Sequence, residues 1–389
     1  MPSAIYEQSM NVSEIYLDNN ATTQPLPEVI ETVARHLRES YGNPSSRHSL
    51  GRKARRVLED SREQIASILG ARPGELLFTS GGTEANNLAV FGLTAQGTGT
   101  ILISPGEHPS NLEACHLRER QGWRIKPLAV ESSGLFSATD LQSSVAGSDD
   151  VRLAAVILAH NETGVIQHVQ PLVKAAQERG FAVHLDGVQA VGKLAINFRE
   201  LGATTLSFGA HKFHGPRGIG GLLVREGVRL APGFAVGGLQ ESGRRAGTEP
   251  VPLIAGMAKA LELWRQTQTE RTAHVRSLRD TLESRLLELA SPAVVNGKTA
   301  ERLPNTLNIS FPGVDGEALL VALDLEGIAC SLGSACASGS IEPTPVLVAM
   351  GLTADVYRSA VRLTLSHLNT LEEIEAAALK IAEVVKYLR

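Results

Sequence analysis

The sequence has few cysteines, no long apolar run and no recognisable leader. Its 389 residues include three cysteines, Cys115, Cys330 and Cys336, without the CxxC spacing of many metal sites. An odd number of cysteines argues against a disulfide framework and favours a reducing compartment. No uncharged apolar run approaches the roughly 20 residues that a transmembrane helix needs. The first residues lack the basic and apolar regions of a secretory signal, so we expect a soluble, cytoplasmic protein with no membrane partner.

The charge is nearly balanced. The chain has 37 Lys and Arg against 41 Asp and Glu, a net charge of −4. Proteins that bind nucleic acids usually carry an excess of basic residues on one surface, so we expect no nucleic-acid partner. The 43% hydrophobic and 20% charged residues are typical of a globular protein. The length is sufficient for a large core and for two or three compact units.

From about residue 75, short apolar runs alternate with longer helical patterns. A helix predicted over 171–179 has Pro171 in its first turn, where helices favour proline. The predicted strands cover residues 75–79, 100–103, 153–158, 182–185, 205–208 and 219–224. Continuous apolar strands separated by helices indicate an α/β fold whose mostly parallel central sheet is buried on both faces.

After Pro250 the pattern changes to one long helical stretch, residues 251–290, which we expect to be broken once and to link two domains. The elements predicted beyond it are a strand 306–311, a helix 315–325, a Gly/Ser/Ala-rich loop 331–340, a strand 361–365 and a helix 371–388. This order is typical of a smaller α+β C-terminal domain. We predict a large domain of residues 19–258, and a small domain of residues 1–18 and 259–389.

Polar residues follow several of the predicted strands, where open parallel sheets bind their ligands. The first strand runs into Gly81, Gly82 and Thr83, which open a helix. The free N–H groups of a helix start favour a phosphate, although an ordinary tight turn explains the glycines equally well. Asp186 follows the strand 182–185, and a carboxylate there needs a cation or several donors. It could be a helix cap, a magnesium ligand or the partner of a protonated ring nitrogen.

Lys212 follows the strand 205–208 in the turn GAHKFHGPRGIGG. Most lysines are solvated, but this turn offers little to solvate one. Partial desolvation would lower the pKa of the amine and make it a competent Schiff-base nucleophile. His211 and His214 alone could suggest a metal pair, but no third ligand is near in the sequence, so we expect no metal.

A cofactor with an aldehyde, a phosphate and a pyridinium nitrogen needs a lysine, a phosphate cradle, a carboxylate and a flat group over its ring. Lys212, the Gly82–Thr83 pair and Asp186 supply the first three. His108 follows the strand 100–103 in GEHPSN and is the candidate for the fourth. The alternative is an ordinary loop histidine, but the position at the end of a strand favours the functional role.

Cys336 lies in the loop 331–340, SLGSACASGS. Ten residues so small and polar cannot form a core, so we expect an exposed loop. A thiol there is a candidate nucleophile or sulfur carrier. Cys115 and Cys330 have apolar neighbours in the sequence, which favours a structural role.

These motifs occur in an order that resembles a known family. The chain resembles the cysteine desulfurases of the NifS/IscS type, within the class-V aminotransferases and the fold type I enzymes that use pyridoxal 5'-phosphate (PLP). The match runs from residue 16 to the end. The motifs that carry it are YLDNNATT, YGNPSSRHSLG, FTSGGTEANNLA, EHPSN, HNETGVIQ, HLDGVQAVGK, SFGAHKFHGPRGIGG, GGLQESGRRAGTEP, LPNTLNISF, SLGSACASGSIEP and VRLTLS.

The resemblance implies PLP as the cofactor and assigns residues to its ring. Lys212 would be the Schiff-base lysine, and Asp186 would bind the pyridinium nitrogen. Gln189 would hydrogen-bond the phenolate oxygen of the cofactor. His108 would stack on the ring and move protons.

The resemblance also implies contacts to the phosphate and to the substrate. Thr83 and His211 would bind the phosphate, with Thr248 reaching it from the neighbouring subunit of a homodimer. Asn161 and Arg362 would hold the substrate carboxylate, a task that suits a guanidinium because it donates two parallel hydrogen bonds.

The implied activity converts L-cysteine to L-alanine while Cys336 takes the sulfur as a persulfide. The long loop around Cys336 resembles the group I enzymes, which pass sulfur to protein acceptors such as an iron–sulfur scaffold or a tRNA-thiolation protein. The alternatives are a related lyase or transaminase, acting on selenocysteine or cysteine sulfinate, and a non-catalytic PLP-binding regulator. The joint presence of Lys212, Cys336 and Arg362 favours catalysis.

One position departs from the family pattern. A serine or threonine that binds the phosphate commonly stands three residues before the Schiff-base lysine, and here that position is Gly209. The lost hydroxyl contact is worth about 1–3 kcal/mol if nothing replaces it. We therefore expect weaker PLP retention rather than loss of activity.

Overall fold

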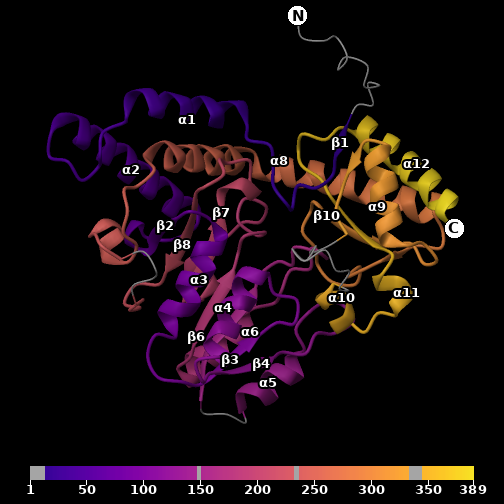
Figure 1. The fold of residues 1–389 in the computed structure, drawn as a ribbon, viewed down its shortest axis with the longest axis horizontal. Coiled ribbons are helices and arrows are strands. Elements are labelled where there is room, and N and C mark those ends of the chain that lie inside the picture. The colour runs from indigo at the N-terminus through magenta and orange to yellow at the C-terminus, as the bar shows by residue number, and fades with distance from the viewer. Residues whose placement is uncertain (1–13, 147–149, 232–235, 333–343) are drawn as a thin grey trace, which may run out of the picture.

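The structure is a computed structural model that describes residues 14–146, 150–231, 236–332 and 344–389. Cys336 and most of its predicted loop lie outside these described residues. The largest element is a seven-stranded sheet in the order β2-β8-β7-β6-β5-β3-β4 (Figure 1). Its strands are β2 (Leu76–Thr79), β3 (Thr100–Ile103), β4 (Arg124–Pro127), β5 (Val151–Ile157), β6 (Ala182–Asp186), β7 (Thr205–Gly209) and β8 (Gly220–Val224).

The sheet is mostly parallel, as predicted. Strands β7, β6, β5, β3 and β4 pair in parallel, whereas β8 is antiparallel to both β7 and β2. Strand β4 was not predicted, because its RIKP sequence is largely exposed at the sheet edge and lacks an apolar run. Glu75, predicted as the start of the first strand, belongs instead to the short helix η1 (Pro73–Glu75).

Both faces of the sheet are buried, which explains the continuous apolar runs. Side chains alternate between faces along a strand. In β3, Ile101 and Ile103 pack in a cluster with Val90 and Cys115, whereas Leu102 packs in the main core on the other face. The helices around the sheet are α1 (Pro27–Glu39), α2 (Ser49–Ile68), α3 (Gly82–Leu93), α4 (Pro109–Glu119), α5 (Ala138–Ala146), α6 (Gln170–Arg179) and α7 (Phe198–Leu201), with short helices η2 (Ala210–Lys212) and η3 (Gln240–Gly243).

The long helix α8 (Val251–Leu289) joins two hydrophobic clusters. Its Trp264 packs in the main core and its Val275 in a second cluster. Between them Thr267 leaves the helical conformation, with φ −122° and ψ 17°. The predicted single break in this helix is therefore confirmed.

The second cluster is built around a small antiparallel sheet, β9 (Val294–Val295), β10 (Thr306–Ser310) and β12 (Ala360–Thr364), with β10 in the centre. Strand β1 (Ile15–Tyr16) pairs in parallel with β11 (Ile328–Ala329). The helices of this part are α9 (Gly316–Leu325), α10 (Pro345–Ala349), α11 (Ala354–Tyr357) and α12 (Leu371–Leu388), to the right in Figure 1. Ile15 and Leu17 pack here, which agrees with grouping residues 1–18 with the C-terminal part. The domain limits themselves stay a prediction.

No helix in the described ranges is both long and apolar enough to cross a membrane.

Candidate active site

A cavity lies at the carboxyl ends of β5 and β6, against the start of α3. It has about 570 Å³ of empty space, part of it open to solvent. Its lining includes eight of the predicted site residues: Gly82, Thr83, His108, Asn161, Asp186, Gln189, His211 and Lys212. The fold thus brings together residues that are up to 130 positions apart in the sequence.

Lys212 ends the short helix that follows β7. Its Nζ donates hydrogen bonds to the carbonyl oxygens of Asn20, at 2.6 Å, and Ala21, at 2.7 Å. Burial, and then the charge of Arg362, lower the pKa of this amine to about 8. A sizeable fraction of neutral amine near neutral pH makes Lys212 a competent nucleophile and base.

Asp186 is the last residue of β6 and is 2% exposed. Its Oδ1 accepts from the backbone N–H of Val188 at 2.9 Å, and its Oδ2 accepts from Nδ2 of Asn86 at 2.7 Å. These two donors fix the plane of the carboxylate at the cavity wall. Within the described ranges no group of three His, Cys, Asp or Glu side chains could hold a metal ion.

His108 and Asp186 are linked through Asn86, which the sequence analysis missed. Nδ2 of Asn86 also donates to Oγ of Ser110 at 2.9 Å, and that hydroxyl lies 2.7 Å from Nδ1 of His108. The backbone N–H of Ser110 donates to the same Nδ1 at 3.1 Å. Nδ1 is therefore an acceptor, and the neutral ring carries its proton on Nε2. Burial lowers the pKa of His108 and favours this neutral form.

The start of α3 has the features of a phosphate cradle. A helix of 12 residues begins at Gly82, and the N–H groups of its first turn have no partner within the helix. A Cβ atom at position 82 would lie 2.5 Å from Cγ2 of Val188, so only glycine fits there. Burial lowers the pKa of His211 to about 4, which leaves a neutral imidazole beside the cradle.

Gln189 is held from two sides. Its Nε2 donates to the carbonyl oxygen of Asn20 at 2.9 Å, and its Oε1 accepts from Nζ of Lys193 at 2.5 Å. Lys193 also donates to Oδ1 of Asn20 at 2.7 Å. Asn20 and Lys193 were not predicted as site residues, although they lie in the family motifs YLDNNATT and HLDGVQAVGK.

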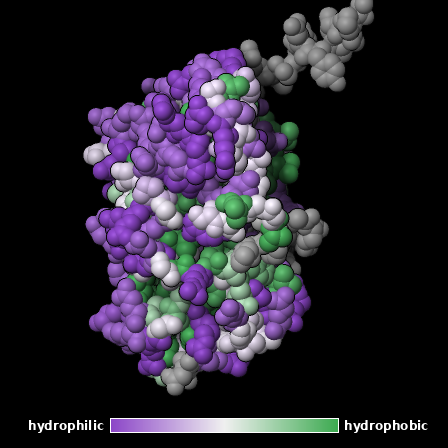
Figure 2. All heavy atoms as spheres, turned by 90° about the vertical axis from the view of Figure 1, so that its left-hand side faces the viewer, coloured by the Kyte–Doolittle hydropathy of each residue, from purple (hydrophilic) through white to green (hydrophobic). Residues whose placement is uncertain are grey.

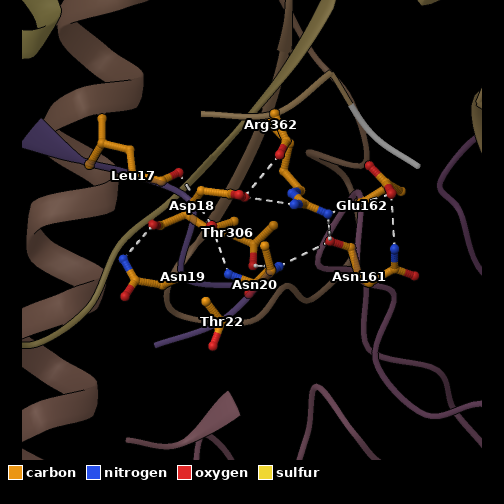
Figure 3. A network of polar contacts seen from close by, with 12 residues as sticks. Leu17, Asp18, Asn19, Asn20, Thr22, Asn161, Glu162, Thr306 and Arg362 are labelled. Atoms are coloured by element: carbon orange, nitrogen blue, oxygen red, sulfur yellow. Dashed lines mark hydrogen bonds and ion pairs between the residues drawn. The ribbon is translucent and has the colours of Figure 1, made fainter. Parts of the chain in front are cut away.

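Arg362 reaches the site from β12. Figure 3 shows its guanidinium between Asp18, Asn161 and Glu162. Nη2 lies 2.8 Å from Oδ1 of Asp18, and Nη1 lies 3.3 Å from the carbonyl oxygen of Asn161 and 3.5 Å from Oε1 of Glu162. Arg362 does not line the cavity. It donates a hydrogen bond to the backbone of Asn161, and Asn161 does line the cavity.

Besides Arg362, two predicted residues are absent from the cavity wall. Thr248 is exposed in the segment before α8, where the resemblance assigns it to the site of a neighbouring subunit. Cys336 lies outside the described residues. The other two cysteines are poor nucleophiles, because burial raises the pKa of both Cys115 and Cys330 to about 12.

Residues 15–377 match the family model described as "Aminotransferase class-V". The chain belongs to the class-V aminotransferase family. Among the curated relatives of this chain is the cysteine desulfurase of Nostoc sp., 42% identical over 380 residues, which are 97% of this chain and 94% of the relative.

Two solved structures resemble this chain over nearly their whole length. A NifS-like protein is 35% identical with a TM-score of 0.90, and the match covers 96% of this chain and 100% of that one. SspA, solved in complex with cysteine, is 30% identical with a TM-score of 0.79, covering 91% and 99%. The predicted family and fold class are thereby confirmed.

Proposed function

We propose that this protein is a PLP-dependent cysteine desulfurase, which converts L-cysteine to L-alanine and transfers sulfur to one of its own cysteines. The observation that carries the proposal is the buried Lys212 amine, with its lowered pKa, in one cavity with Asp186 and His108. The cysteine desulfurase of Nostoc sp. matches the chain almost end to end, and SspA supports cysteine as the substrate.

The residues present fit PLP. The orphan N–H groups at the start of α3 suit a phosphate, and Gly82 has no side chain to hinder the approach of one. The fixed carboxylate of Asp186 suits a protonated ring nitrogen. Lys212 would hold the cofactor, and the other wall residues would contact it as the resemblance implies. Bound PLP would supply an aldehyde and an electron-accepting ring.

Side chains of the protein would bind the substrate, transfer protons and accept the sulfur. Arg362 and Asn161 would hold the substrate carboxylate, with the guanidinium supplying charge-assisted hydrogen bonds. Lys212, as a neutral amine, would take the substrate's α-proton and return it. His108 would present its Nε2–H as a proton donor. The Cys336 thiolate would attack the substrate sulfur: a sulfur–sulfur bond forms, the carbon–sulfur bond breaks, and the electron pair left on carbon takes a proton to give L-alanine.

A homodimer is part of this proposal. Exposed apolar side chains occur around the connection between α1 and α2, where Leu37 is 62% exposed, Tyr41 70% and Leu50 42%. On the side of the molecule that carries this connection in Figure 1, apolar surface lies between polar regions (Figure 2). Such a surface suits a second copy, whose Thr248 would then complete the phosphate site. We further propose a cytoplasmic enzyme of group I that supplies protein acceptors for iron–sulfur cluster assembly or tRNA thiolation.

Three variants test the proposal. Lys212→Ala should lose both the yellow absorbance of bound PLP and all turnover. Cys336→Ala should keep the absorbance but lose desulfuration, whereas Cys330→Ala, the matched control, should keep both. Sulfide and alanine are measured together on each purified variant. Full desulfuration by Cys336→Ala would refute the nucleophile and favour a lyase acting on selenocysteine or cysteine sulfinate.

A further inference from the structure

Asp18 stands where three distant segments of the chain meet. It lies two residues after the end of β1, and its side chain is 19% exposed. One oxygen, Oδ1, accepts two hydrogen bonds: from Nη2 of Arg362 at 2.8 Å and from Oγ of Ser331 at 3.0 Å. Ser331 and Arg362 are also paired through their backbones, N to O at 3.2 Å and 2.6 Å. The carboxylate of Asp18 thus joins the side chain of Arg362 to Ser331, whose backbone is already hydrogen-bonded to that of Arg362.

The guanidinium of Arg362 is held on two sides and left open on a third. Asp18 holds Nη2, and the carbonyl oxygen of Asn161 holds Nη1. That carbonyl is itself fixed by Nδ2 of Asn20 at 3.0 Å (Figure 3). Nε of Arg362 is buried and has no hydrogen-bond partner among the described residues. A buried charged donor without a partner is costly, so this nitrogen is suited to an incoming anionic oxygen.

We propose that Asp18 is a positioning residue for the substrate: it sets the orientation in which Arg362 receives the carboxylate of L-cysteine, and Ser331 in turn holds Asp18. The inference rests on the proposed desulfurase function. Ser331 stands five residues before Cys336 in the sequence, so the same carboxylate oxygen contacts both the substrate-binding arginine and the start of the segment that carries the proposed nucleophile.

Asp18 could have the opposite effect, because a carboxylate already paired with the guanidinium competes with the substrate's carboxylate. The geometry favours positioning. The side chain of Arg362 is 7% exposed, and Asp18 occupies Nη2 while leaving Nε open. Without Asp18 the guanidinium would be free to turn toward Glu162, whose Oε1 is already 3.5 Å from Nη1, and Nε would lose the orientation that we propose for receiving the substrate. The two effects predict opposite changes in KM.

The test is the isosteric variant Asp18→Asn, with Asp280→Asn as a matched control. Asp280 pairs with the neighbouring Arg279 at 2.6 Å but is 56% exposed on α8. For Asp18→Asn we expect KM for L-cysteine to rise about ten-fold, the scale of one charge-assisted hydrogen bond, with a smaller change in kcat. The dissociation constant of L-alanine, measured by titrating the absorbance of bound PLP, should rise equally. That of ethylamine, which lacks the carboxylate, should not change.

Ser331→Ala tests the second link. It should raise KM about two- to three-fold, and it should add nothing in the Asp18→Asn background, because contacts in series are not additive. An additional rise in the double variant would overturn this link. Asp18→Ala gives a larger perturbation, and circular dichroism establishes whether it folds; if it does not, Asp18→Asn decides alone.

An unchanged or lowered KM in Asp18→Asn would overturn the positioning role, as would equal weakening of L-alanine and ethylamine. These results are distinct from a failure of the proposed function, in which the unaltered protein would release no alanine from L-cysteine.

Discussion

Glu107 gives the sharpest quantitative prediction, because it is an acid buried beside the site. The residue is 6% exposed. Its Oε1 accepts from the backbone N–H of Ile157 at 2.7 Å, and its Oε2 accepts from Nδ2 of Asn111 at 2.8 Å. Burial, with a further contribution from the negative charge of Asp186, raises the pKa of Glu107 from 4.5 to about 8. Glu107 is therefore mostly neutral at pH 7 in the folded protein.

The neutral form can also hydrogen-bond to Asn111, which lies 2.8 Å from the carboxyl group. Oδ1 of Asn111 is buried without a hydrogen-bond partner among the described residues. The two ends of an amide can be exchanged by rotating it, and a protonated Glu107 would then donate its O–H to this oxygen. Glu107→Gln reproduces that arrangement permanently, because its Nε2–H can donate to Asn111 while its Oε1 accepts from Ile157.

The folded state binds this proton more tightly than the unfolded state does. The stability that Glu107 contributes is therefore fully present below about pH 4.5 and is lost as the pH rises through about 8. The rise in pKa from 4.5 to about 8, at about 1.4 kcal/mol per pH unit, corresponds to about 5 kcal/mol. Glu107→Gln should match the unaltered protein within about 1 kcal/mol at pH 5 and exceed its free energy of unfolding by up to about 5 kcal/mol at pH 9.

The measurement is urea unfolding from pH 5 to 9, followed by the fluorescence of Trp123 and Trp264, with PLP saturating and protein concentration fixed. Buried histidines such as His160 and His184 also make the free energy of unfolding depend on pH, since burial lowers their pKa to about 4 in the folded state. Their contribution is the same in both proteins and cancels in the difference between them. Glu270→Gln, on an exposed position of α8, is the control. Parallel pH curves for Glu107→Gln and the unaltered protein would refute the reasoning.

Two further predictions concern the cofactor and the loop before α8. A Cβ at Gly209 would lie 3.4 Å from the backbone nitrogen of Gly82, ordinary contact, so Gly209→Ser should fold and place a hydroxyl at the phosphate cradle. The dissociation constant of PLP, measured by equilibrium dialysis, should fall about five- to one-hundred-fold, and an unchanged constant would show that another group already fills this role. The carboxylate of Glu241, 2% exposed, accepts from Nη2 of Arg62 at 2.6 Å and from the N–H of Phe78 at 3.0 Å. Glu241→Gln should lower the free energy of unfolding by about 3 kcal/mol, because the buried guanidinium of Arg62 loses the negative charge that compensates it. Glu31→Gln, in an exposed pair with Arg38, should lower it by less than about 1 kcal/mol. Equal losses of the two variants in urea unfolding would contradict this.

Much of the fold followed from local pattern. The bounds of β3 and α12 agree with the prediction, and most other strand ends differ by one or two residues, because apolar periodicity and the glycines and prolines between the runs are local properties. The missed strand β4 shows the limit: an edge strand with exposed side chains owes its conformation to pairing with β3, not to its own composition.

The sequence by itself determined the chemistry of the site: an amine, a carboxylate, a glycine-led helix start and an imidazole, each at the end of a predicted strand. Tertiary structure alone decided how these groups are held. Ser331 and Arg362 both donate to one oxygen of Asp18, although up to 344 positions separate these residues in the sequence. Asn86 likewise joins Asp186 to Ser110 across two helices and a strand. Periodicity specifies which residues form an element but not which elements become neighbours. The pKa values of Lys212 and Glu107 depend on burial, which exists only once those elements have packed.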